Sequence, residues 1–67
     1  MNYFTKIKIK KNIKRLSKQN GKTSSTNLQK YVEGLSLSSE KDKKFTIGCI
    51  KKYYPSATDT ILYIELL

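Results

Sequence analysis

The sequence predicts a single small α+β domain in which one main helix packs on a three-stranded antiparallel sheet. Three segments, at 3–10, 45–54 and 60–67, are rich in β-branched and aromatic residues. The clearest helical spacing of apolar residues is confined to 26–35. With 67 residues the chain supports one domain with a modest core, because a chain of this size buries only about 60% of its unfolded surface.

The N-terminal segment alternates lysines with apolar residues, as a half-buried strand does. Residues 3–10 place isoleucines on one face and lysines on the other. Ile9, Ile13 and Leu16 then follow helical spacing, so residues 11–18 are expected to form a short helix. One long helix beginning at residue 3 is disfavoured, because the earliest apolar side chains would lie off its apolar stripe.

The main helix is predicted after a turn at 19–24, where an Asn-Gly pair supports positive φ. Ser25 or Thr26 is expected to be its N-cap, since the spacing is that of a capping box. Apolar residues then recur at i, i+3, i+4 and i+7 through 26–35. Gly34 is expected to weaken the end of this helix.

The C-terminal half is predicted to form a loop or a frayed helical turn at 36–44 and then a β-hairpin. The strands are expected at 45–54 and 60–67, joined by a turn at 55–59 that contains the only proline. The predicted core consists of the apolar residues on the inner faces of these elements. They are Ile7, Ile9, Leu28, Tyr31, Val32, Leu35, Phe45, Ile47, Cys49, Leu62 and Ile64.

An all-α domain of three to four short helices is the alternative. Ser39 with Asp42, and Ser56 with Asp59, both have the spacing of a helix cap. In the first of these helices three side chains would share a face: Phe45, Cys49 and Tyr53. Gly48 and the surrounding β-branched and aromatic residues favour the strand instead.

Charge is distributed unevenly along the single domain, residues 1–67. The net charge is +9, from 14 Lys and Arg against five Asp and Glu, and no acidic residue precedes Glu33. The chain therefore divides into a basic N-terminal segment, 1–24, and a near-neutral, core-forming part, 25–67. Because crowded like charges destabilise a compact state, the surplus predicts an anionic partner.

The sequence predicts a binding protein and no enzyme. It contains no His and one Cys, which excludes Ser-His-Asp and Cys-His relays and the common zinc clusters. No catalytic residue, metal ligand or cofactor is predicted.

The predicted function is nucleic-acid binding, to DNA or RNA, through contacts with phosphates. A stripe that is nearly all lysine favours backbone contacts over base reading. Tyr53 and Tyr54 are candidates for base stacking. The predicted contact residues are Lys6, Lys8, Lys10, Lys11, Lys14, Arg15, Lys18, Lys22, Lys51 and Lys52.

A second interpretation is a small inhibitor or adaptor, of the phage or mobile-element type, that docks on an acidic surface of a larger protein. A sheet this small would leave its edges unpaired, so a homodimer or a place in a larger complex is also expected. No apolar run of about 18 residues and no secretory signal occur, which predicts no membrane partner. The lone cysteine indicates a reducing, cytoplasmic setting.

Overall fold

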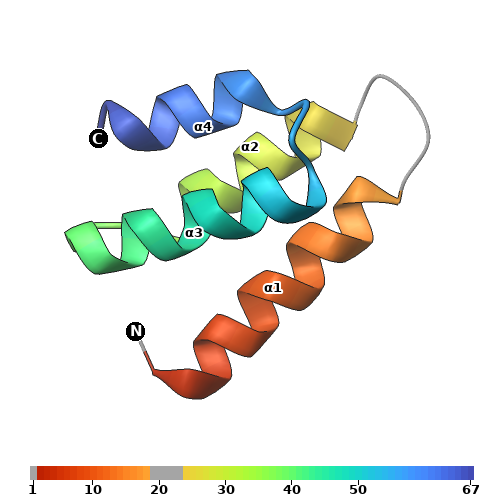
Figure 1. Ribbon diagram of the computed structural model, residues 1–67. Coiled ribbons are helices and arrows are strands. Elements are labelled where there is room, and N and C mark those ends of the chain that lie inside the picture. The colour runs from red at the N-terminus through yellow and green to blue at the C-terminus, as the bar shows by residue number, and fades with distance from the viewer. Residues whose placement is uncertain (1, 19–23) are drawn as a thin grey trace.

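The computed structural model describes residues 2–18 and 24–67, which form four helices (Figure 1). Their bounds are α1, Tyr3–Ser17; α2, Ser24–Gly34; α3, Glu40–Tyr53; and α4, Thr58–Glu65. The described part of the chain contains no strand, so the predicted α+β fold, with its sheet and C-terminal hairpin, is wrong. The observed class is the all-α alternative.

The four helices are arranged as two antiparallel hairpins. α1 and α4 each pack against both α2 and α3. α1 and α3 run in the same direction, because Lys6 lies at Phe45 and Lys14 lies at Tyr53. Figure 1 shows α2 and α4 running back in the opposite direction. The molecule therefore has one layer made of α1 and α3 and a second layer made of α2 and α4.

The N-terminal segment is helical from Tyr3, so the predicted strand at 3–10 is wrong. The helix predicted at 11–18 is the second half of this longer one. The Asn2 side chain caps the first turn by accepting a hydrogen bond from the backbone N–H of Thr5 at 2.8 Å. Since lysine is a good helix former, the lysine-rich segment continues the helix once this cap is made.

The buried face of α1 explains why the alternation of lysines and apolar residues at 3–10 wrongly indicated a strand. Ile9, Ile13 and Leu16 are buried at helical spacing, and the remaining apolar side chains do not need to join them. Ile7 is half-buried on a different side of α1 from these three residues, and Phe4 is 73% exposed. Single exposed apolar side chains are common on protein surfaces, so they do not exclude a helix.

The helix predicted at 26–35 is confirmed as α2, with different ends. It begins at Ser24, so Ser25 and Thr26 lie inside the helix and neither is its N-cap. The predicted turn at 19–24 lies outside the described residues except for its last residue, which is helical.

α3 occupies nearly all of the predicted strand at 45–54, so that prediction is wrong. α3 also includes residues 40–44, where the expected loop is wrong and its alternative, a helical turn, is closer to the structure. The Ser39 hydroxyl accepts a hydrogen bond from the backbone N–H of Asp42 at 3.3 Å, so the capping spacing was the correct signal. Acidic residues in the first turn and lysines in the last complement the helix dipole. Thr46, a β-branched residue, is accommodated by donating its hydroxyl to the Asp42 carbonyl at 2.9 Å.

α4 replaces the predicted strand at 60–67. Its N-cap is Ala57, which makes no side-chain capping bond, so the expected cap of Ser56 with Asp59 is not used. Ala57 and Thr60 are instead buried, at 4% and 2% exposure. We attribute the helix to this tertiary packing, which commonly overrides local propensity.

The core joins all four helices. Of the predicted core, five residues are confirmed as buried: Ile9, Leu28, Val32, Cys49 and Ile64. Four others are half-buried and pack against this core: Tyr31, Leu35, Phe45 and Ile47. The core also contains residues that were not predicted: Ile13, Leu16, Ile50 and Ala57. The prediction for Leu62 is wrong, since its side chain is 53% exposed.

These errors have one geometric cause. A strand buries every second residue, which selected Ile47 and Cys49 and left Ile50 on the opposite face. A helix groups residues three and four apart, so Cys49 and Ile50 are buried together with Thr46. The same change of period moves Leu62 to the surface of α4.

Candidate functional site

Charged side chains are distributed unequally between the two layers of helices. α1 carries six cationic side chains and no carboxylate, and α3 carries five lysines and two carboxylates. α2 carries one residue of each sign, and α4 carries two carboxylates and no cation. Because α1 and α3 are neighbours, the positive charge of the described helices is concentrated on one layer of the molecule.

The contact between α1 and α3 leaves an open groove, here called the α1–α3 groove, which has two hollows. The N-terminal hollow, of about 260 Å³, is lined by Tyr3, Lys6, Ile7, Lys10 and Phe45. The central hollow, of about 300 Å³, is lined by Lys10, Lys44, Phe45, Gly48, Cys49, Lys52 and Tyr53. Two residues line both hollows, so the groove is continuous, and no carboxylate lines either one.

Lysines border this groove in two rows. The row on α1 repeats at every fourth residue and consists of Lys6, Lys10 and Lys14. Each such step advances about 6 Å along a helix. The row on α3 consists of Lys44 and Lys52, with Gly48 midway between them. Since α1 and α3 are parallel, the two rows run side by side.

Aromatic rings hold three of these lysines at the rim. The Nζ of Lys6 lies 5.5 Å from the centroid of the Phe45 ring. The Nζ atoms of Lys14 and Lys52 lie 6.0 and 5.4 Å from the centroid of the Tyr53 ring. Contacts of this kind contribute about 0.5–1 kcal/mol each at exposed sites. The contacts of Lys6 and Lys14 link α1 to α3 at the two ends of the groove, whereas Lys52 and Tyr53 both belong to α3.

The aromatic residues predicted to stack on bases are not the exposed ones. Two lysine ammonium groups lie at the Tyr53 ring, and Tyr54 ends α3 and packs against the core. Tyr3 and Phe4 are 72% and 73% exposed. Their rings meet edge to face, with centroids 6.1 Å apart. The exposed aromatic surface is therefore at the start of α1, beside the N-terminal hollow.

Some predicted contact residues lie on the side of α1 that faces α2. Arg15 donates a hydrogen bond to the Asn12 side-chain oxygen at 3.1 Å, and the Asn12 amide donates to the Tyr31 hydroxyl at 3.1 Å. Lys8 is seven residues before Arg15 and so lies on the same side of the helix. Neither cation lines the α1–α3 groove.

The other predicted contacts are also outside the groove. Lys11 and Lys18 are exposed and lie on the side of α1 opposite the core. Lys51 lines a hollow between α3 and α4, and Lys22 lies outside the described residues. Of the predicted set, Lys6, Lys10 and Lys52 line the groove, and Lys14 lies at its border through its contact with the Tyr53 ring.

Sequence reasoning missed Lys44 and Gly48 as lining residues. Lys44, Gly48 and Lys52 share one helix face, next to the face that carries Phe45 and Cys49. This spacing was visible in the sequence, but a strand at 45–54 left Lys44 in a loop. Only the helical period brings these residues to one surface.

Cys49 lies on the floor of the central hollow and is 8% exposed. Burial raises the pKa of the Cys49 thiol above its ordinary value, although the positive charges of Lys10 and Lys52 act in the opposite direction. The folded protein therefore favours the neutral thiol, which is the less reactive form.

We expect iodoacetamide at about pH 8 to label the folded protein about tenfold more slowly than the urea-unfolded chain, because thiolate and access are both reduced in the fold. Mass spectrometry follows the reaction, and the single cysteine makes the product unambiguous. Because the unfolded chain loses this proton first, stability should decline as the pH rises above the ordinary thiol pKa. Equal labelling rates in both states would contradict the burial of Cys49.

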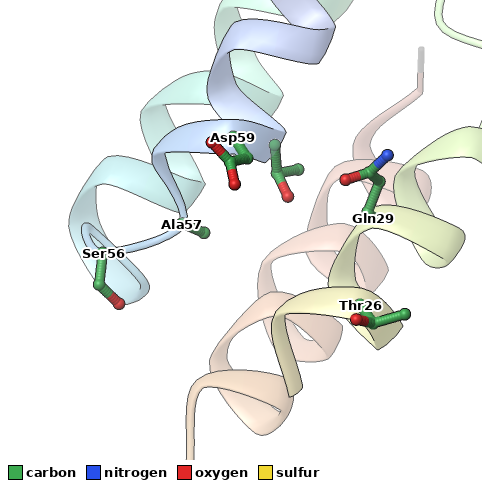
Figure 2. A pocket seen from close by; sticks show the side chains of 6 residues that line it. Thr26, Gln29, Ser56, Ala57 and Asp59 are labelled. Carbon is green, nitrogen blue, oxygen red and sulfur yellow. The ribbon is translucent and has the colours of Figure 1, made fainter. Parts of the chain in front are cut away.

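A separate polar hollow lies between the N-terminal turns of α2 and α4 (Figure 2). Its volume is about 200 Å³, and it is lined by Thr26, Gln29, Ser56, Ala57, Asp59 and Thr60. Figure 2 shows Thr26 and Gln29 on the α2 side of this hollow and Asp59 on the opposite side, on α4. With a carboxylate and no cation in its lining, this hollow does not extend the basic groove.

Within the described ranges, no group of three or more His, Cys, Asp or Glu residues could hold a metal ion. In that same part of the chain, every helix is too short or too polar to cross a membrane. No family model, curated protein or solved structure matches the sequence significantly.

Proposed function

We propose that this protein is a non-catalytic nucleic-acid-binding protein that holds a phosphate backbone in the α1–α3 groove. The observation that carries this proposal is the pair of parallel lysine rows along a groove without a carboxylate in its lining. Lysine binds phosphate as a point charge, and each contact releases counterions condensed on the nucleic acid.

The length of the rows favours a polymer over a small anion. Lys6 and Lys14 are eight residues apart, which corresponds to about 12 Å along a helix. A nucleic-acid strand carries a phosphate about every 3.4 Å of helix axis, so several phosphates would fall within this length. A single small anion would contact only one or two of the lysines.

The composition of the groove argues against the other predicted partner, an acidic protein surface bound by an inhibitor or adaptor. Cores of protein–protein interfaces are depleted of lysine and enriched in arginine and large aromatic residues. The α1–α3 groove shares the aromatic side chains, Tyr3, Phe45 and Tyr53, but it has five lysines at its border and no arginine. The expectation of a homodimer rested on open sheet edges, and the described residues form no strand.

The proposed setting is the reducing interior of a cell, where a free thiol such as Cys49 persists. This assignment follows from cysteine chemistry alone. It is compatible with a nucleic-acid partner, which is found in the same compartment.

The proposal is tested by fluorescence anisotropy with labelled single- and double-stranded DNA and RNA of one sequence. We expect micromolar or tighter affinity at about 50 mM salt and a loss of about 10²–10³-fold at about 200 mM, as five phosphate contacts would give. Polyglutamate of similar length is the control for attraction to any polyanion. Absence of nucleic-acid binding at the lower salt would overturn the proposal, and tight polyglutamate binding in its place would indicate an acidic protein partner.

A further inference from the structure

We infer that the α1–α3 groove selects single-stranded nucleic acid and receives two consecutive bases in its two hollows. This inference rests on the proposed function and specifies its ligand. The apolar lining of the groove supports this inference, because contacts with phosphates alone do not require apolar side chains.

Each hollow combines an apolar surface with a cationic rim. Tyr3, Ile7 and Phe45 line the N-terminal hollow between Lys6 and Lys10. The Lys6 ammonium lies over the Phe45 ring, so Tyr3 and Ile7 offer the open apolar surface there. Phe45 and the buried Cys49 line the central hollow, which Lys44 and Lys52 border. In a duplex the bases are paired and stacked inside, so only phosphates would reach these surfaces. An unpaired strand can turn its bases outward, where aromatic and apolar side chains bind them.

The lining residues of the two hollows occur in the same order as the bases and phosphates along one nucleic-acid strand. Lys10 and Phe45 belong to both hollows and therefore stand at their boundary. With a base in each hollow, the phosphate that links the two nucleotides would lie at Lys10. Lys6 and Lys52, further out on either side, would face the flanking phosphates.

Gly48 is the second observation that indicates a ligand in the central hollow. After proline, glycine is the poorest helix former, yet Gly48 lies in the interior of α3. A Cβ built on this residue would have no neighbouring atom within 4 Å, so packing does not require a glycine here. Because Gly48 lines the central hollow, any larger side chain would occupy part of that hollow.

The test replaces Gly48 with methionine, which is uncharged and a better helix former. Gly34→Met is the matched control, because Gly34 is also helical, has nothing within 4 Å of a built Cβ, and does not line the groove. Gly48→Met should weaken binding of an unstructured oligothymidine about tenfold, as loss of one stacked base would. Its affinity for a duplex should fall by a clearly smaller factor, since the phosphate-binding lysines are unchanged. Gly34→Met should change neither affinity.

A second variant tests the other hollow. Tyr3 is 72% exposed, so Tyr3→Leu removes its ring without disturbing the core. It should weaken oligothymidine binding by about fivefold and duplex binding by a smaller factor. Thermal melting of each variant checks that the fold is retained.

The outcomes separate this inference from the proposed function. Wild-type protein that binds duplex as tightly as single strands would overturn the inference and leave the proposed function in place. The same holds if Gly48→Met binds oligothymidine like the wild type, or loses duplex affinity to the same extent. Wild-type protein that binds no nucleic acid would overturn both.

Discussion

Replacing the three α1 groove lysines together, Lys6, Lys10 and Lys14, by glutamine should weaken nucleic-acid binding about 10²–10³-fold at about 50 mM salt. The slope of log affinity against log salt should also become shallower by about 2–3, because three phosphate contacts are lost. Glutamine is a good helix former, so α1 is expected to persist. Anisotropy titrations across a salt series measure both quantities.

The matched control removes the same charge from the same helix outside the groove. Lys8, Lys11 and Arg15 are exposed cations of α1 that neither line a hollow nor lie over an aromatic ring that does. Their joint replacement by glutamine should cost less than about tenfold in affinity, since only longer-range attraction is reduced. Equal losses in the two triple variants would mean that net charge, and not the groove, determines binding.

Ile50→Ala is expected to have the largest effect on folding. The Ile50 side chain has 0% exposure in the middle of the core, and removing such a side chain typically costs about 2–5 kcal/mol. Whole domains are stable by only about 5–15 kcal/mol, and small ones lie at the lower end. The variant should therefore lose a large part of its stability, which urea titration followed by circular dichroism at 222 nm would show as a lower midpoint.

Leu62→Ala is the control that distinguishes the helical fold from the predicted sheet. Leu62 is 53% exposed on α4, so its truncation should cost less than about 1 kcal/mol. A β-hairpin at 45–54 and 60–67 would bury Leu62 and expose Ile50. In that case the two variants would exchange their effects, and the four-helix structure would be contradicted.

The sequence alone predicted α2 because its apolar residues follow a helical period and few of its residues favour strands. It failed for α3 and α4, where β-branched and aromatic residues are frequent. The spacing of the Ser39 cap indicated a helix, whereas the side chains that follow it favour a strand. The burial of Thr46 and Ile50 in the core decides between the two, and the sequence alone does not show it. Ala57 carries no capping signal at all, so the start of α4 depends on tertiary contacts.

The sequence predicted the lysines of α1 that form part of the candidate site, but it did not predict the groove that they border. The lysine stripe contained Lys6, Lys10 and Lys14, which the structure places on one side of α1. Their pairing with Lys44 and Lys52 depends on the contact of α1 with α3. These helices are separated in the sequence by α2, and no local pattern reports which distant helices become neighbours.

The division of charge between the two layers gives the molecule a strong electric dipole moment. Its extents are 31 × 25 × 19 Å, each larger than the Debye length of about 10 Å at 0.1 M salt, so the acidic α4 does not cancel the field on the opposite side. A polyanion would rotate such a particle into the binding orientation before contact, which raises the encounter rate. The layer of α2 and α4 would then face away from the bound strand and offer little attraction to a second one. The arrangement therefore favours one strand per molecule and opposes cross-linking of strands.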